Sequence, residues 1–279
     1  MPNPLQPVDL TAYLATETGA EIELRRLFPR SAPLVIFDIG ACEGEESIRY
    51  ALEFPRARIF AFEPLPANQE LIRANLAKYA VRGVELVPLA LADREGEAIF
   101  HVSSGRPEHE YAGKDWNYGN KSSSLLPPAQ SDPMHGWIVF KESITVRTTT
   151  LDGFCRERDI GRVDFLHLDV QGAEALVLAG AGAMLPRVGA LWLEVARREL
   201  YRGQALRDEL QAHLQARGFV LTHECDRGDE GDRFYVNRRT AAGRRRVALL
   251  LVERAARKLR RFAGAVKRRL RPAGGARPP

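Results

Sequence analysis

Apolar runs of strand length recur along the chain, and segments with apolar residues at helical spacing follow them. Residues 34–37, 58–62 and 84–89 are expected strands, and residues 45–54 and 68–79 are the helices expected between them. Strands that alternate with helices are typical of βαβ units. The pattern therefore predicts an α/β fold with a mainly parallel sheet and helices on both faces.

The same rhythm returns in the second half of the chain. The expected elements there are strands at 164–168 and 190–193, helices at 173–179 and 204–216, and closing strands at 219–222 and 233–236. Gly218 directly follows the second of these helices and suits its C-terminal cap. One domain of doubly wound architecture is the expected result.

The middle of the chain departs from this rhythm. Residues 98–102 read as an exposed strand, and residues 143–149 alternate as expected for an edge strand. The loop between them, residues 103–136, is rich in Gly, Ser, Pro and aromatic residues. A loop of this length within a compact domain is usually functional or disordered, and we expect it to help select a substrate.

The flanking segments set the domain boundaries. Residues 8–28 read as helical and precede Pro29 and Pro33, so residues 1–33 form a helical preamble. The sequence predicts one domain over residues 34–237 and a separate basic tail over residues 238–279.

Charge is distributed unevenly along the 279 residues. The net charge is +5, yet the tail alone holds fifteen Lys/Arg and one acid, Glu253, so the preceding residues carry a net charge of −9. Three isolated cysteines lack the spacing of a zinc site or a disulfide framework, and the opening residues lack the pattern of a secretory signal. We expect a cytoplasmic protein with an acidic globular part.

The tail has the pattern of a basic amphipathic helix. Between residues 244 and 271, apolar positions recur at steps of three and four, and Arg and Lys occupy most of the others; the apolar positions are Val247, Leu251, Ala255, Leu259, Phe262, Val266 and Leu270. Such a helix suits the anionic inner surface of a membrane. Nucleic acid, and docking on the protein's own domain or another subunit, are the alternatives.

The first expected strand ends in a turn that carries acids and glycines. Gly40 permits a sharp turn, and Gly44 permits close approach of the backbone to a ligand or a helix. Their spacing is not the G-x-G-x-x-G of dinucleotide sites, and Asp38 and Glu43 would repel a pyrophosphate. The acids instead suit a cofactor with a cationic amino group and a sulfonium centre.

Two further acids end the strands that are expected to flank the first strand. Glu63 follows the second strand, where a carboxylate can accept both hydroxyls of a ribose. Asp169 ends the strand at 164–168 and is the candidate for work on the acceptor, either orienting or deprotonating a hydroxyl or helping to hold a metal. A solvated loop acid and a helix cap are the alternative interpretations of Glu63 and Asp169.

Six segments in order resemble FkbM-type methyltransferases over residues 34–194. They are Phe37-Asp38-Ile39-Gly40-Ala41, Ala61-Phe62-Glu63-Pro64, Ala90-Leu91-Ala92-Asp93-Arg94-Glu95-Gly96, Ser122-Ser123-Ser124-Leu125, Thr150-Leu151-Asp152 and Leu168-Asp169-Val170-Gln171-Gly172-Ala173-Glu174. The resemblance implies the class I methyltransferase (Rossmann-like) fold, with a seven-stranded sheet that includes one late antiparallel strand, here at 233–236. It also implies S-adenosylmethionine as methyl donor.

The resemblance assigns roles to individual residues. Asp38, Gly40, Ala41 and Gly44 would line the cofactor turn, Glu63 would hold the ribose, Asp93 would lie near the adenine, and Ser123 and Asp169 would face the reacting end. The chain departs from the family pattern at Cys42-Glu43, at His167, where lysine is common, and at Gln171, where glutamate is common. His167 by itself is interpreted as structural.

The implied reaction is O-methylation of a sugar, glycan or natural product by direct displacement at the methyl carbon. A sugar hydroxyl is a poor nucleophile at neutral pH, so a base or a divalent metal is expected near Asp169. The alternatives are a non-catalytic methyltransferase-like protein that acts through its tail and a nucleic-acid methyltransferase. A nicotinamide oxidoreductase is disfavoured by the turn.

Overall fold

The computed structural model describes residues 7–107, 117–129 and 136–269; for residues 254 and 257–269 it describes the backbone alone. Parts of the expected substrate loop, 108–116 and 130–135, therefore lie outside the described residues, as do Leu270 and Arg271 of the tail.

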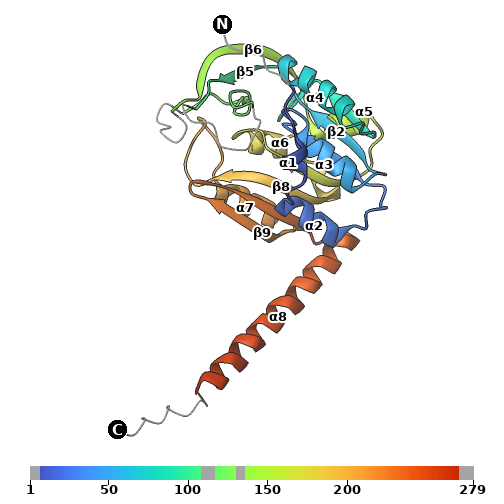
Figure 1. Ribbon diagram of the computed structural model, residues 1–279, viewed down its shortest axis with the longest axis vertical. Coiled ribbons are helices and arrows are strands. Elements are labelled where there is room, and N and C mark those ends of the chain that lie inside the picture. The colour runs from blue at the N-terminus through green and yellow to red at the C-terminus, as the bar shows by residue number, and fades with distance from the viewer. Residues whose placement is uncertain (1–6, 108–116, 130–135, 270–279) are drawn as a thin grey trace.

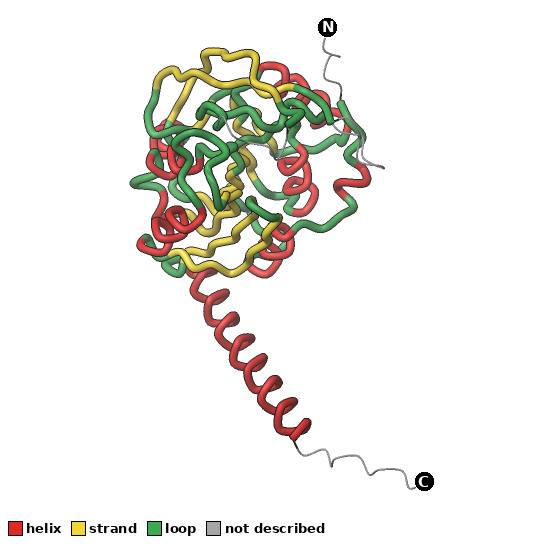
Figure 2. Tube along the Cα trace, turned by 90° about the vertical axis from the view of Figure 1, so that its left-hand side faces the viewer, coloured by secondary structure: helices red, strands yellow, loops and turns green. Residues whose placement is uncertain are grey.

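A single seven-stranded sheet forms the centre of the molecule, with helices on both faces (Figures 1 and 2). In spatial order its strands are β3 (Val84–Val87), β2 (Arg58–Phe62), β1 (Val35–Ile39), β7 (Val163–Leu168), β8 (Val188–Ala196), β10 (Glu230–Asn237) and β9 (Phe219–Arg227). The first five are parallel, and β10 is antiparallel to both of its neighbours. The predicted mainly parallel sheet with a late antiparallel strand is confirmed. The order reverses between β1 and β7, which is where open α/β sheets bind ligands.

Alternate side chains of the strands pack against two different helical layers. Phe37 and Leu166 face the layer of α5 (Leu151–Glu157), α6 (Glu174–Ala179) and α7 (Arg207–Ala216). Ile36 and Phe165 face the layer of α2 (Gly19–Leu27), α3 (Glu45–Glu53) and the start of α8 (Ala241–Arg269). Helix α4 (Pro66–Lys78) packs on the α3 side, and a short 3-10 turn, η1 (Leu185–Arg187), precedes β8.

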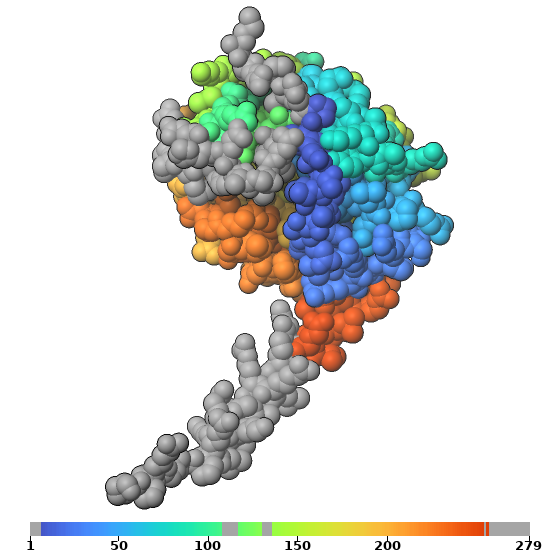
Figure 3. Space-filling view, viewed as in Figure 1, coloured from blue at the N-terminus to red at the C-terminus, as the bar shows by residue number. Residues whose placement is uncertain are grey.

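The amino-terminal segment forms two helices, α1 (Thr11–Leu14) and α2, rather than the single helix expected. Thr18 begins α2, because its side chain accepts a hydrogen bond from the Glu21 amide at 3.2 Å. Leu24 is fully buried in the same core cluster as Trp192. In Figure 3 this dark blue segment lies along the seam between the light blue and orange parts of the domain. The preamble is thus packed into the domain.

A second sheet has three strands: β4 (Ala90–Leu91), β5 (Gly96–Ser104) and β6 (Val139–Thr149). Strand β6 pairs with β5 along most of its length, whereas β4 pairs only with Thr148 and Thr149. The prediction of an edge strand at 143–149 is therefore confirmed for residues 143–147 and wrong for the last two. Alternation of apolar and polar residues indicates that one face of the sheet is exposed to solvent. A strand in the middle of such a sheet has the same alternation. Part of the loop is fixed to this sheet, since Ser124 and His101 exchange backbone hydrogen bonds of 2.8 and 3.1 Å.

Helix α8 starts on the domain and then extends away from it (Figures 1 and 2). Its first turns are docked by a buried ion pair of 3.2 Å between Arg246 and Glu23 of α2. Leu251 and Val252, just beyond, are 61% and 66% exposed. Of the helices within the described ranges, none is both long and apolar enough to cross a membrane.

Candidate active site

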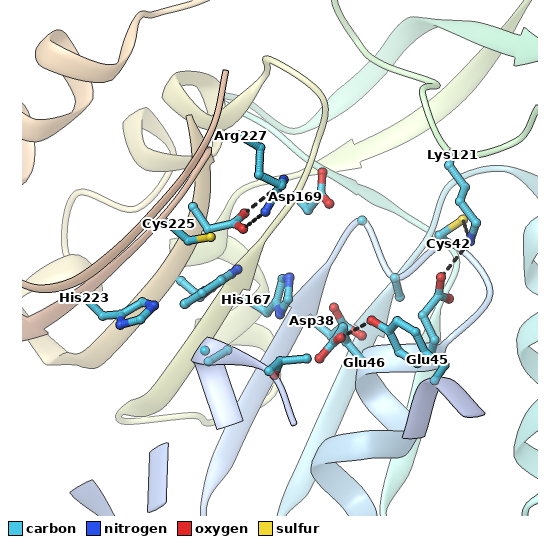
Figure 4. A pocket seen from close by; sticks show the side chains of 18 residues that line it. Asp38, Cys42, Glu45, Glu46, Lys121, His167, Asp169, His223, Cys225 and Arg227 are labelled. Atoms are coloured by element: carbon cyan, nitrogen blue, oxygen red, sulfur yellow. Dashed lines mark hydrogen bonds and ion pairs between the residues drawn. The ribbon is translucent and has the colours of Figure 1, made fainter. Parts of the chain in front are cut away.

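A cavity of about 440 Å³ lies at the carboxyl ends of β1, β7 and β8, on the side covered by the amino-terminal segment. Figure 4 shows Asp38 and His167 near its centre, Lys121 and Glu45 at one end, and Cys225 and Arg227 at the other. These side chains come from five separate parts of the chain.

The turn after β1 is built on Gly40. Its φ is +86°, and an added Cβ would lie 1.8 Å from the carbonyl oxygen of Asp169, so only glycine fits. The turn therefore brings the ends of β1 and β7 together. Gly44 has a φ of +80° and starts α3, where an added Cβ would contact Ile72 of α4 at 3.4 Å. The close approach at Gly44 is to a helix.

Asp38 lies under the larger cavity and is 1% exposed. The hydroxyl of Ser47 donates a hydrogen bond of 2.5 Å to it. Burial raises the pKa of Asp38 to about 6, although the nearby His167 works in the opposite direction. The carboxyl is thus held in place and can change its charge near neutral pH.

Glu63 at the end of β2 lies in a second, smaller cavity of about 50 Å³. Its two carboxylate oxygens accept hydrogen bonds from the amides of Cys42 at 2.9 Å and Leu65 at 2.8 Å. Burial raises the pKa of Glu63 to about 7. Apolar side chains, including Leu89, Leu91 and Phe100, form much of the remaining wall.

The chemistry of this smaller cavity fits the adenosyl part of S-adenosylmethionine. A carboxyl that accepts hydrogen bonds suits ribose hydroxyls, and apolar walls suit a purine ring. Asn120 and Lys121 form part of its wall, so we expect both residues to adjust when the cofactor binds.

Lys121 crosses from the loop to the β1 turn and borders both cavities. Its ammonium lies 2.7 Å from Glu45 and 3.4 Å from Glu43. Burial works against this charge, but Cys42 and the two acids hold the pKa of Lys121 above its ordinary value. Sequence reasoning missed Lys121, because nothing in a polar loop indicates which residue folds back onto the turn.

Asp169 borders both cavities, on the side away from Glu63. The side-chain amide of Gln171 donates to Asp169 at 2.7 Å and to Glu194 at 3.0 Å, and so holds the two carboxylates together. Burial raises the pKa of Asp169. The Tyr201 hydroxyl lies 3.0 Å from the side-chain carbonyl oxygen of Gln171 and 2.8 Å from the backbone oxygen of Ser122, and its one proton is shared between these two acceptors.

The structure brings together most of the residues proposed for the site. Asp38, Gly40, Ala41 and Asp169 line the larger cavity, and Gly40, Glu63, Ser123 and Asp169 line the smaller one. Gly44 and Asp93 line neither, and Asp93 is exposed after β4. Their roles as cofactor ligands stay predictions without support from the cavity walls.

Several cavity residues were not identified from the sequence as site residues. Asp38, His167 and Trp192 are register partners on neighbouring strands, and His223 stacks on Trp192 with ring centroids 6.0 Å apart. His167, interpreted from the sequence as structural, lines the cavity wall. Strand alternation could have indicated it, since His167 is two residues before Asp169. Across the described ranges, no cluster of three or more His, Cys, Asp or Glu side chains suited to a metal ion was found.

The sequence matches the methyltransferase FkbM domain over residues 38–221. The chain belongs to the FkbM methyltransferase family. This FkbM-family chain is 33% identical to the 2-O-methyltransferase NoeI of Sinorhizobium fredii, over 71% of this chain and 77% of that protein. It is 27% identical to the 31-O-demethyl-FK506 methyltransferase FkbM of Streptomyces tacrolimicus, over 69% of this chain and 75% of that one.

A solved structure with a similar fold is the precorrin-6y C5,15-methyltransferase of Geobacter metallireducens, with a TM-score of 0.42 and 15% identity over 82% of this chain and 92% of that one. Membership of the FkbM family confirms the resemblance seen in the sequence. The chain is an S-adenosylmethionine-dependent methyltransferase.

Proposed function

We propose that this FkbM-family enzyme methylates a hydroxyl of a sugar, glycan or related natural product. The observation that carries the proposal is the pair of adjoining cavities that share Gly40, Cys42, Lys121 and Asp169. One has the chemistry for a nucleoside, and the other has space for an acceptor beside it. The relatives named above, a 2-O-methyltransferase and a 31-O-demethyl-FK506 methyltransferase, support an oxygen acceptor.

In this proposal the protein acts mainly by holding two partners in line. S-adenosylmethionine, when bound, supplies a methyl group on a positively charged sulfur. Glu63 would hold the ribose, Asp38 would attract the cationic end of the cofactor, and Asp169 would accept a hydrogen bond from the acceptor hydroxyl and orient it. The amide of Gln171, 2.7 Å from Asp169, keeps that carboxylate from rotating.

The charges around the larger cavity favour an acceptor without phosphate groups. Asp38, Glu45, Glu46, Asp169 and Asp232 all line it. Its two strong cations are already paired, Lys121 with Glu45 at 2.7 Å and Arg227 with Asp232. An anionic acceptor would meet net negative charge, whereas hydroxyl groups can donate to carboxylates.

Calorimetry with S-adenosylmethionine tests the cofactor site, with wild type compared with Glu63→Ala and NAD as the control ligand. We expect micromolar binding to wild type, binding at least tenfold weaker to the variant, and no binding of NAD. A folded wild type that binds no S-adenosylmethionine would refute the proposal and favour the non-catalytic alternative.

The acceptor side is tested by methyl transfer from labelled S-adenosylmethionine to a pool of methyl glycosides of neutral monosaccharides. Asp169→Asn should lower the turnover about 100-fold while the cofactor affinity stays unchanged. Full turnover by this variant would remove Asp169 from the mechanism.

We further propose that the distal part of α8 lies on an anionic membrane surface, which would bring the enzyme to lipid-linked acceptors at the inner face of a membrane. The helix continues to Arg269 and extends away from the domain after its docked first turns. Its sequence in that part is rich in Lys and Arg with apolar residues at helical spacing. Nucleic acid is the competing partner, but the net negative charge of the globular part would repel its phosphate groups.

A further inference from the structure

His167 occupies a position in the larger cavity that the proposed function leaves unused. It lies on β7 two residues before Asp169, and both residues line the cavity. Side chains two apart on a strand point to the same side, with Cα atoms about 7 Å apart. An acceptor hydroxyl held by Asp169 can therefore also reach the ring of His167.

One nitrogen of the His167 ring is fixed from behind. Nδ1 lies 2.6 Å from the hydroxyl of Tyr50 on α3 and shares a hydrogen bond with it. Tyr50 is fully buried and the His167 side chain is 8% exposed, so neither group can turn away easily. The second nitrogen, Nε2, has no hydrogen-bond partner among the residues that the structure describes.

The hydrogen bond between Tyr50 and Nδ1 allows two neutral forms of the His167 ring, because either group can be the donor. Burial raises the pKa of Tyr50 well above its usual value, and the charge of Glu46 adds to this, so the phenol keeps its proton. In one of the two forms Nδ1–H donates to the phenol oxygen. A neutral imidazole protonated on Nδ1 has its lone pair on Nε2.

Carboxyl groups lie on the elements that surround His167. Charged and titratable groups lie around this part of the cavity on each neighbouring element: Asp38 on β1, Asp169 after β7, Glu45, Glu46 and Tyr50 on α3, Tyr13 on α1, His223, Cys225 and Arg227 on β9, Asp232 on β10, and Cys42 and Lys121 at the far end. Asp38 and Asp169 interact directly with His167 through their charges.

We propose that His167 is the general base of methyl transfer, with Nδ1–H donating to the hydroxyl of Tyr50, which positions the ring; this rests on the proposed function. In the step, the acceptor O–H bond breaks and its proton goes to Nε2, while the oxygen forms a bond to the methyl carbon. The carbon–sulfur bond breaks, and its electron pair stays on sulfur, which becomes a neutral thioether. The imidazolium later releases the proton to water. Asp169 orients the hydroxyl and does not take its proton.

The first test needs neither cofactor nor acceptor. Nitrogen-15 NMR of the imidazole rings in the free protein at pH 8 reports which nitrogen of His167 is protonated. We expect the Nδ1–H form in wild type and a mixture of both forms in Tyr50→Phe. A wild-type ring protonated on Nε2 would overturn the proposal, because that nitrogen could then only donate.

The second test measures turnover with S-adenosylmethionine and the same pool of methyl glycosides. His167→Gln should lose 100-fold or more in kcat, Tyr50→Phe about tenfold, and both should bind S-adenosylmethionine within threefold of wild type. His101→Gln, a histidine outside both cavities on β5, is the matched control and should retain full turnover.

The outcomes separate this inference from the proposed function. His167→Gln with turnover within threefold of wild type would overturn the role of His167 alone. A wild type that transfers no methyl group to any member of the pool would overturn the proposed acceptor class and the base together.

Discussion

Buried carboxyl groups are the most unusual residues of this site. Burial raises the pKa of Asp38 to about 6 and the pKa values of Glu63 and Glu174 to about 7. Each raised pKa means that the fold holds the proton more tightly than the unfolded chain does. These groups therefore contribute stability at acidic pH, and the contribution is lost as the pH rises toward their raised pKa values.

Glu63 offers a direct test of this linkage. Its contribution is fully present below pH 4.5 and is lost as the pH rises to about 7, by up to roughly 3 kcal/mol. The unfolding free energy of wild type should fall relative to that of Glu63→Gln over this window, as measured by urea unfolding at several pH values. Parallel curves for the two proteins would contradict the expectation; the exposed Glu97→Gln serves as control.

Gly40 is the residue whose backbone the site depends on most. Gly40→Ala combines a φ of +86° with a 1.8 Å clash against backbone, and we expect a loss of several kcal/mol in unfolding free energy, together with loss of cofactor binding. Gly203→Ala, with a φ of +79° and open space around it, isolates the conformational part. It should cost about 1 kcal/mol. Equal losses in the two variants would show that the contact with Asp169 is unimportant.

The residues that the sequence indicated are those whose role follows from the end of a strand. Asp38, Glu63 and Asp169 each end a buried apolar run, which places them at one edge of a parallel sheet. His167 and Lys121 could not be assigned in the same way. Their roles depend on Tyr50 and on Glu45, and the sequence alone does not indicate these contacts.

At the scale of elements, the hydrophobic pattern predicted most helices and strands correctly. Each βα unit is a short stretch of sequence, so its pattern is set by residues close together in the chain. The prediction of an edge strand at 143–149 was wrong only at Thr148 and Thr149, where β4 also pairs with β6, since the pairing of a strand depends on distant partners. The amino-terminal helix was expected in one piece, and the cap at Thr18 divides it.

A buried ion pair attaches the first turns of α8 to α2. Arg246 and Glu23 are 2% and 1% exposed, so removing Arg246 leaves the buried Glu23 carboxylate with the half-exposed Arg26 as its remaining cation. Arg246→Met should lower the unfolding free energy by about 3 kcal/mol, and adding Glu23→Gln should restore part of it. Arg244→Met, on an exposed position of the same turn, should have little effect. A double variant no more stable than the single one would contradict this account.

For the whole molecule, the family resemblance predicted the seven-stranded, mainly parallel sheet and its late antiparallel strand. It did not predict how the ends of the chain meet. Helix α8 docks on α2, and residues of α2 line the larger cavity. The charge distribution indicated a boundary after residue 237. The first turns of α8 lie beyond this boundary and nevertheless pack on the domain.

The tail should be tested by a truncation that respects this packing. A chain that ends after Glu253 keeps the ion pair of Arg246 and should melt within about 2 °C of the full chain, whereas one that ends after Asn237 should melt several degrees lower. Co-sedimentation with phosphatidylglycerol vesicles should be lost in both, and 0.5 M salt should weaken it in the full chain. Binding that survives truncation after Glu253, or no binding by the full chain, would refute the membrane proposal.

The small cavity beside Glu63 has a consequence for the speed of the enzyme. Asn120 and Lys121 form part of the wall of this cavity, so we expect a purine to enter it when they withdraw, and Lys121 then leaves Glu45 and Glu43. The fraction of molecules open at any moment then scales the apparent affinity for the cofactor. In stopped-flow experiments the observed rate of association should level off at high S-adenosylmethionine concentration, at the rate of this opening. The same opening would then limit how fast the spent cofactor leaves, and so set the pace of successive turnovers.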